Sequence, residues 1–307
     1  MTSPRWLRPL TIGVLSLLMI SYVLVWWLGP VNPLEALRIS YFMLIGVFGA
    51  SIANSTGTGG GVVFIPAFSI VQEAAGLSLT TAQIVAISFV IQSFGMTIGS
   101  LTWINRLYKD GPSSIGVREQ DFFRIIGLVV ACCLPVLWLT QAASRIDAQQ
   151  LLLLFKSFSI VLGSLLLLSV FRTEKGTPPR QHLSKIDWIA LAIMGAAGGL
   201  ATALFSVGVG EFVALYLFIR GFSLNTSVAT AVVISAITVI AGVPLSILNN
   251  EIVWEIIAVA APGVVIGGYL GRRIAQSLGA RRLKLMASLW IIGSCLFLIT
   301  RALGLNS

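Results

Sequence analysis

The chain has 307 residues, of which 57% are hydrophobic and only 10% are charged, and its mean hydropathy is +0.96. A soluble protein of this length needs a charged exterior that 31 Lys, Arg, Asp and Glu residues cannot supply, so the composition excludes that class. The net charge of +9 would suggest nucleic acid in a soluble protein, but here the basic residues lie in short stretches between apolar runs. We therefore expect the partner to be a lipid bilayer and not a nucleic acid.

Apolar stretches long enough for membrane helices follow one another along the chain. The first, 10–28, comes after Arg5 and Arg8 as in a signal peptide, but no small-residue cleavage site follows it, so we expect an uncleaved transmembrane helix. The later apolar segments fall at 37–53, 61–72, 80–103, 122–140, 150–171, 187–206, 210–219, 224–248, 253–271 and 284–303. We expect helices in all of them, because in lipid the backbone must satisfy its own hydrogen bonds.

Two adjacent pairs of these segments are joined by linkers that lack the charge of a solvated loop. The first linker, 54–61, has the sequence Asn-Ser-Thr-Gly-Thr-Gly-Gly-Gly, and the second, 207–211, has Val-Gly-Val-Gly-Glu. Each linker is flanked by at least one short apolar arm. We therefore expect two hairpins whose tips lie at or near membrane depth.

The distribution of basic residues predicts the orientation. With the N-terminus in the cytoplasm and each hairpin returning to the side it left, 16 of the 20 Lys and Arg residues fall on the cytoplasmic side. Only Arg38, Arg145 and Arg301 fall outside, and Lys156 lies within a span. Because basic loops stay in the cytoplasm, we expect a multi-pass protein of the bacterial inner membrane with a cytoplasmic N-terminus and a periplasmic C-terminus.

After the first helix the chain repeats a hairpin followed by three spans. Since each unit crosses the membrane three times net, the two units are predicted to be inverted copies. The expected fold is an all-α polytopic membrane protein with an inverted-topology repeat, each half a broken or re-entrant helical hairpin plus three transmembrane helices, with one extra N-terminal helix. The predicted boundaries are 1–36 for that helix, 37–171 for the first repeat, 172–186 for a cytoplasmic linker and 187–307 for the second repeat. Such halves can expose a central site to either side in turn, although a duplicated scaffold without a transport role is an alternative.

Glycine-rich segments in both halves carry a family resemblance. They are Gly46 and Gly49, 57–61, Pro66 and 82–88 in the first half, and 195–210 and 229–231 in the second. In order and recurrence, over roughly 40–303, they resemble the sulfite exporter TauE/SafE family. The resemblance implies a membrane permease that exports sulfite, organosulfonates or related small organic anions. Glu211 and Phe212 depart from the first-half pattern, because they stand where Gly60 and Gly61 would align.

The hairpin tips are the main candidates for anion binding. A helix that starts within 59–62 leaves its first backbone N–H groups pointing at the tip, and these donors and the helix dipole favour an anion. Glycines let an oxyanion approach the backbone, and neighbouring polar side chains add donors. The predicted substrate-binding residues are Asn54, Ser55, Thr56, Gly57, Thr58, Gly59, Gly60 and Gly61 in the first half, and Ser206, Gly208 and Gly210 in the second. The alternative is that the glycines only permit close helix packing.

Two charged residues are candidates for coupling. Lys156 lies among apolar residues, where it attracts an anion, pairs with Glu211 or reaches the outer interface. Glu211 lies at the second tip, where a buried carboxylate needs a partner, a proton or a helix dipole. Second-rank polar candidates are Thr80, Thr81, Gln83, Gln92, Asn225, Thr226 and Ser227. Thr80 and Asn225 are expected to be helix caps, whereas Gln83 and Gln92 are expected to bond between helices.

Other kinds of chemistry lack their residues in this sequence. Cys132, Cys133 and Cys295 lie in apolar spans without metal or redox spacing, and His182 lies in the predicted linker. We therefore expect no metal, no cofactor and no enzymatic activity. The sequence predicts a secondary transporter, an exporter of a small anion such as sulfite, an organosulfonate or a related organic acid, that works by alternating access. A passive anion channel and a non-transporting accessory protein are the alternatives, and proton coupling and a homodimer both stay open.

Overall fold

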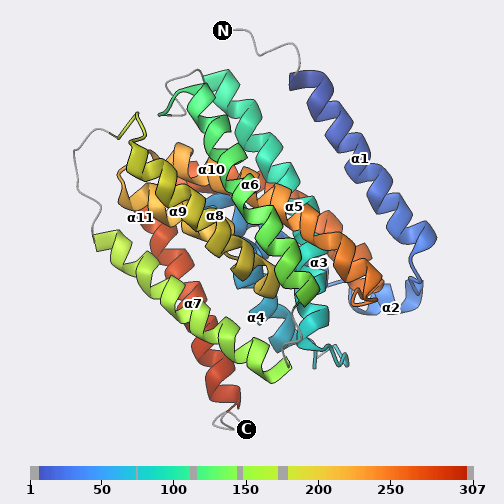
Figure 1. Ribbon diagram of the computed structural model, residues 1–307. Coiled ribbons are helices and arrows are strands. Elements are labelled where there is room, and N and C mark those ends of the chain that lie inside the picture. The colour runs from blue at the N-terminus through green and yellow to red at the C-terminus, as the bar shows by residue number, and fades with distance from the viewer. Residues whose placement is uncertain (1–6, 74, 111–115, 144–147, 172–178, 303–307) are drawn as a thin grey trace.

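The structure is a computed structural model that describes residues 7–73, 75–110, 116–143, 148–171 and 179–302. Within these ranges the regular elements are helices, which confirms the predicted all-α class (Figure 1). In chain order they are α1 (Leu7–Leu28), α2 (Pro33–Arg38), α3 (Phe42–Thr56), α4 (Gly61–Val71), α5 (Thr81–Asp110), α6 (Glu119–Ala143), α7 (Ala148–Phe171), α8 (Lys185–Phe205), α9 (Val209–Ile219), α10 (Leu224–Leu248) and α11 (Trp254–Ala302).

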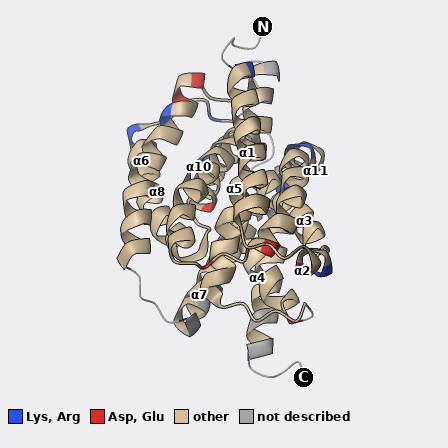
Figure 2. Ribbon diagram, turned by 90° about the vertical axis from the view of Figure 1, so that its right-hand side faces the viewer, with Lys and Arg blue, Asp and Glu red and all other residues tan. Residues whose placement is uncertain are grey.

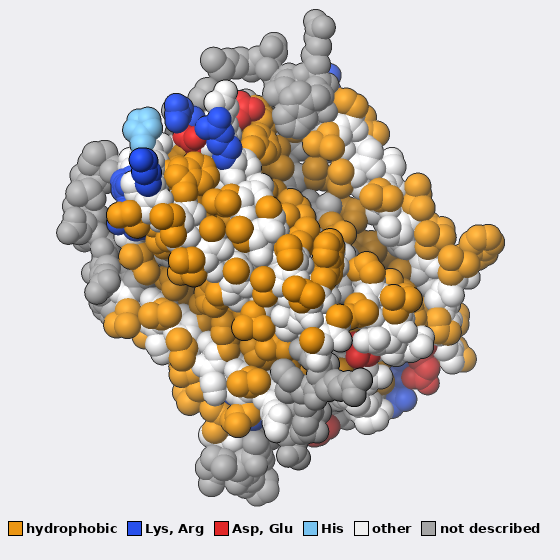
Figure 3. All heavy atoms as spheres, in the orientation of Figure 1, with side chains coloured by type: hydrophobic (Ala, Val, Ile, Leu, Met, Phe, Trp, Pro, Cys, Tyr) orange, Lys and Arg blue, Asp and Glu red, His pale blue; other side chains and the backbone are white. Residues whose placement is uncertain are grey.

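The exterior of the bundle is apolar, as a surface that faces lipid must be. Six stretches of the described chain are long and apolar enough to cross a membrane, in α1, α5, α6, α8, α10 and the first part of α11. Hydrophobic side chains cover most of the face seen in Figure 3. The chain is therefore a multi-pass membrane protein.

The two ends of the bundle differ in charge, and most Lys and Arg positions lie toward one of them (Figure 2). At that end α6 and α10 begin side by side, since a Cβ on Gly116 would lie 2.7 Å from Ser223 Oγ. Arg180 and Arg220 both bond Asp187 there, and we call this the basic end. The opposite end carries the turn between α10 and α11. In Figure 1, α1 begins at the basic end and α11 finishes at the opposite end. Arg5, Arg145 and residues 172–178 of the predicted linker lie outside the described residues.

Two predicted boundaries are wrong. The segment expected at 37–53 is divided, because α2 ends at Arg38 and α3 begins only at Phe42. The loop expected between 271 and 284 is instead part of α11, where only Gly279 departs from helical geometry, with φ 72° and ψ 166°. Arg272 of this segment is only 6% exposed, and its guanidinium lies 5.6 Å from the centroid of the Trp103 ring.

Two short helix pairs form the expected hairpins. α3 is followed by Gly57 in the left-handed conformation (φ 76°), and α8 is followed by Ser206 in the same region (φ 54°). A left-handed residue ends a helix and redirects the chain. The second arms, α4 and α9, have 11 residues each, so they are about 16 Å long and reach only about half-way through a bilayer core. The inverted relationship of the two halves stays a prediction.

A row of glycines lets α3 lie directly against α11. A Cβ on Gly263 would come within 2.1 Å of the Met43 carbonyl oxygen, and one on Gly267 within 2.4 Å of the Val47 carbonyl oxygen. From the other side, a Cβ on Gly46 would lie 2.7 Å from the Ala260 carbonyl oxygen. Such close backbone contact is the usual means of holding membrane helices together. It fixes the first arm of the first hairpin on a long helix of the second half.

Gly267→Ala should destabilise the protein, whereas Gly293→Ala on the same helix should not. The first substitution forces α3 and α11 apart, at a cost of about 1–3 kcal/mol. The second meets nothing within 4 Å and replaces glycine by a better helix former, a gain of up to about 1 kcal/mol. Thermal unfolding in detergent measures both, and equal unfolding temperatures for the two variants would contradict the proposed contact.

Candidate functional site: the paired hairpin tips

The tips of the two hairpins meet inside the bundle. We call residues 57–61 the first tip and residues 206–211 the second tip, and all of them are buried. A Cβ on Gly61 would lie 2.6 Å from the Phe205 carbonyl oxygen, and one on Gly210 would lie 3.0 Å from the Gly57 carbonyl oxygen. The absence of side chains at these two glycines therefore lets backbone meet backbone.

Glu211 joins the two tips through its carboxylate. One oxygen, Oε1, accepts a hydrogen bond from the backbone N–H of Gly59 on the first tip. The other, Oε2, accepts from the backbone N–H of Gly208 on its own tip, at 2.8 Å. The side chain is 1% exposed. The backbone donors that the sequence predicted for a substrate anion are thus held, in this conformation, by a carboxyl group of the protein itself.

Gln92 of α5 makes a second connection between the tips. Its Oε1 accepts from the backbone N–H of Gly60 at 2.5 Å, next to the donor that Glu211 occupies. Its Nε2 donates to the Ser206 hydroxyl at 2.8 Å and lies 3.1 Å from the Ser206 carbonyl oxygen. The same amide group lies 2.8 Å from the Ser88 hydroxyl, one turn earlier on α5. Gln92 therefore holds both tips against the long helix that lies between them in the chain.

The electrostatic field at this point is positive from two directions. α4 begins at Gly61 and α9 begins at Val209, so the N-terminal ends of two helices adjoin the Glu211 carboxylate. A helix N-terminus carries unpaired N–H donors and the positive end of the helix dipole, and both favour a negative group. At the start of α9 the N–H of Val209 donates a hydrogen bond to the Thr202 hydroxyl, at 3.2 Å.

The family model described as Sulfite exporter TauE/SafE matches residues 41–298. The chain belongs to the TauE/SafE family. It is accordingly a membrane transporter, and the matched range contains both hairpins and leaves out α1 and α2. Searches of curated proteins and of solved structures found no match.

In this TauE/SafE chain the polar residues before the first tip point in different directions. Thr56 and Thr58 face each other with 2.6 Å between their hydroxyl oxygens, directly beside the glycines. Ser55 donates back to the Ile52 carbonyl of its own helix. Asn54 lies away from the glycines, because its amide donates to Ala50 and its backbone carbonyl accepts from the Trp103 indole at 3.1 Å. Of the predicted polar residues, Thr58 is the one within the first tip.

The second-rank candidates at helix starts also bond different partners. Gln83 and Thr80 bond each other at the start of α5, so Thr80 caps this helix as expected. Gln83 was expected to bond another helix, but these bonds are within its own helix start. The expectation that Asn225 caps α10 is wrong, because Ser223 is the N-cap and its hydroxyl accepts from the Thr226 N–H at 3.1 Å. Ser227 bonds Ser223 in the same first turn. These residues lie at helix starts outside the two tips.

Lys156 stays a separate candidate. It is 8% exposed on α7. The contacts of Glu211 described above are with backbone N–H groups of the tips. An ion pair between Lys156 and Glu211 is therefore still a prediction.

Several residues near the tips were missed by the sequence analysis. Thr202 accepts from the Val209 N–H of the second tip, and Ser88 accepts from the amide of Gln92. Ser235 of α10 is 3% exposed, its Oγ has no hydrogen-bond partner, and a Cβ on Gly210 would lie only 2.1 Å from it. The available signal was a hydroxyl inside an apolar helix, which is common in packed membrane helices and does not by itself mark a site. Within the described ranges, no group of three His, Cys, Asp or Glu side chains comes together as a metal site.

Gln92→Ala should destabilise the protein far more than Gln83→Ala, although both replace a glutamine of α5. The first leaves the buried Gly60 N–H without its acceptor and removes the bonds to Ser206, and each unsatisfied buried group costs about 1–3 kcal/mol. The second removes an exposed bond at the helix start, worth about 0.5–1 kcal/mol. Thermal unfolding in detergent compares the two, and similar losses would mean that Gln92 does not join the tips.

Proposed function

We propose that this protein is a secondary transporter that exports a small anion, such as sulfite, an organosulfonate or a related organic acid, through a site at the paired tips. One observation carries the proposal: the Glu211 carboxylate already lies against backbone N–H donors of both tips. A site that accommodates a carboxylate between two helix N-termini has the charge and the donors for a free anion of similar size.

The substrate and Glu211 compete for the same donors in this account. A sulfite or sulfonate presents three oxygens, which match the N–H groups of Gly59, Gly60 and Gly208. The Ser235 hydroxyl beside Gly210 has no partner and offers one more donor. When a proton neutralises Glu211, the carboxyl group competes less well for these N–H groups, so protonation favours anion binding. A proton and an anion then favour each other's binding, so the two would cross the membrane in the same direction and an outward anion gradient would carry the proton with the anion.

Alternating access follows from where the tips belong. The first tip is carried by α3 and α4, which lie before the middle of the chain, and the second tip is carried by α8 and α9. A movement of one hairpin against the other would open the contact between the tips toward one end of the bundle and then the other. We place the basic end in the cytoplasm, because basic residues remain on that side. The contact of both tips around Glu211 favours this mechanism over a passive anion channel, which needs an open path.

Gly59→Leu should abolish anion export while the protein still inserts into the membrane. A Cβ at Gly59 already meets Glu211 Oε1 at 3.2 Å, so the larger side chain fills the space between the tips. Gly293→Leu is the matched control, because a Cβ at that position meets nothing within 4 Å. The measurement is counterflow of sulfite and of methanesulfonate in proteoliposomes, which also separates a transporter from a channel. Normal counterflow by the Gly59→Leu protein would rule out the tips as the site.

Glu211→Gln should remove the pH dependence of methanesulfonate counterflow. Methanesulfonate keeps its charge between acidic and neutral pH, so any dependence reports on the protein. In the wild type, counterflow should rise as pH falls, since the protonated Glu211 releases the N–H donors of the tips. The Gln variant carries a permanently neutral side chain and should give a flat profile. A profile as steep as that of the wild type would assign the proton to another group.

A further inference from the structure

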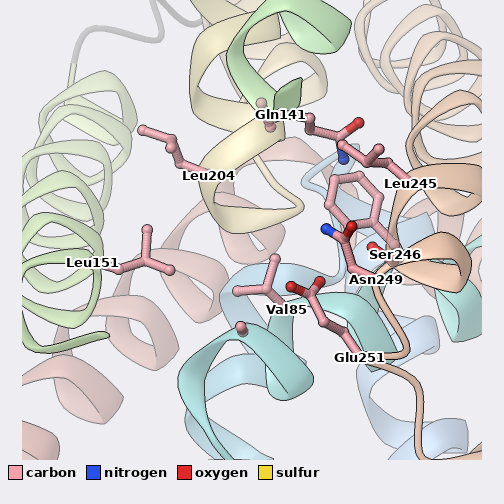
Figure 4. Close-up of a pocket in the computed structure, with 11 residues that line it drawn as sticks. Val85, Gln141, Leu151, Leu204, Leu245, Ser246, Asn249 and Glu251 are labelled. Carbon is pink, nitrogen blue, oxygen red and sulfur yellow. The ribbon is translucent and has the colours of Figure 1, made fainter. Parts of the chain in front are cut away.

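A cavity of about 170 Å³ opens at the opposite end of the bundle, away from the basic end (Figure 4). Five helices and the turn after α10 line it, so it lies where the ends of α6, α8 and α10 approach the starts of α5 and α7. Its lining is mixed, with Leu151, Leu204 and Val85 on one side and Leu245 and the polar side chains of Gln141, Asn249 and Glu251 on the other. A mixed lining of this kind suits a passage for water and small solutes better than a lipid contact.

The cavity leads toward the paired tips. Ala203 and Leu204 line it, and they lie directly before Phe205 and the second tip. On α5 the lining residues Val85 and Phe89 are four apart, and Gln92 is three further on, so all three lie on one face of that helix. Gln92 bonds both tips. Following this face inward from the cavity therefore reaches the proposed anion site.

Phe89 lines the cavity and lies one turn before Gln92 on α5. Its side chain is 1% exposed, and a Cβ on Gly242 would lie 2.5 Å from its ring. The ring thus packs tightly against α10 beside the cavity.

Glu251 gives this cavity its charge. In Figure 4 the Glu251 carboxylate and the Asn249 amide extend into the cavity from the turn after α10. Glu251 is the one titratable side chain among the described lining residues. The other lining residues are neutral: α5 presents Ala82, Val85 and Phe89, α6 Gln141, α7 Leu151, α8 Ala203 and Leu204, α10 Leu245 and Ser246, and the turn after α10 Asn249.

Three other charged residues lie close in sequence to residues that line the cavity. Glu255, at the start of α11, accepts from the backbone N–H of Asn32 at 3.3 Å, and Arg145 and Asp147 lie outside the described residues. Burial raises the pKa of Glu251 above its ordinary value of 4.5, and the hydrogen bond from Asn249 offsets part of this rise. A group with a raised pKa takes up its proton at a less acidic pH than a free glutamate does.

We propose that this cavity is the outer vestibule of the transport path and that Glu251 controls its charge, excluding anions when ionised and admitting them when protonated. The assignment of the cavity to a path rests on the proposed function. An exporter gains from this arrangement, because an anion released at neutral pH is repelled from the vestibule and does not return. The site is selective for charge, so it distinguishes small anions from small cations at the outer face.

The test measures the charge of the vestibule without any transport. Ala203→Cys places a thiol in the cavity lining, and Leu204→Cys is a second position should the first variant fail to fold. Intact cells are treated with two membrane-impermeant methanethiosulfonates, one carrying a trimethylammonium group and one a sulfonate. The ratio of the two labelling rates reports the local charge, and the ionisation of the thiol cancels in this ratio. Labelling of Cys132, Cys133 and Cys295 is subtracted with the parental chain.

The cationic reagent should react faster, and Glu251→Gln should lower the ratio of rates by about tenfold, the lower end of the range for charged clefts. With Glu251 present the ratio should also fall as the medium is made acidic, whereas in the Gln variant it should stay constant. Glu255→Gln is the matched control, since it neutralises an acid at the same end that bonds Asn32, and should leave the ratio unchanged.

An unchanged ratio in the Glu251→Gln protein, or an equal change in the Glu255→Gln protein, would overturn the assignment. So would labelling that occurs only in inside-out vesicles, which would put the cavity on the cytoplasmic side. The result is independent of the anion site. Normal flux in the Gly59→Leu protein together with the expected labelling would refute the site at the tips and leave the charged vestibule standing.

Discussion

The N–H groups at the start of a helix need acceptors, and within a membrane there is no bulk water to supply them. This protein brings two such helix starts together, those of α4 and α9, in the buried centre of the bundle. The Glu211 carboxylate and the Gln92 amide oxygen accept from three of these groups, on Gly59, Gly60 and Gly208. The rest of the architecture serves to hold the two starts face to face.

Glycine makes this arrangement possible at two scales. Where α3 and α11 meet, glycine leaves out the side chains that would separate the two helices, and this fixes the first hairpin. At the tips it lets the backbone of Gly61 approach Phe205 and that of Gly210 approach Gly57. The packing interpretation of these glycines and the binding interpretation are therefore compatible. The same absence of side chains that permits the contact leaves the N–H donors open to an anion.

Much of the fold could be predicted from the sequence, because bilayer thickness and backbone hydrogen bonding leave few choices. The helical class and the two hairpins followed from apolar length and from linkers without charge. The kink at Gly279 was not predicted. The basic residues around it indicated a loop, whereas one glycine with non-helical dihedral angles is enough to kink the helix. The burial of Arg272 was not predicted either, because a long basic side chain can pack over an aromatic ring inside the bundle.

The site was harder to predict, because hydrogen-bond partners far apart in the chain decide it. The glycine tips could be located from composition, but the bond between Glu211 and Gly59 spans 152 positions and has no local signal. Gln92 was only a second-rank candidate for the same reason, and no local signal showed that the side-chain amide of Asn54 donates to Ala50 of its own helix. The account depends most on whether a substrate anion takes the place of Glu211. A structure determined with bound 2-bromoethanesulfonate, whose bromine can be located by anomalous scattering, tests this directly. The sulfonate should lie within hydrogen-bond distance of the Gly59 and Gly60 N–H groups with Glu211 displaced. A sulfonate bound elsewhere, with Glu211 still bonded to Gly59, would contradict the account.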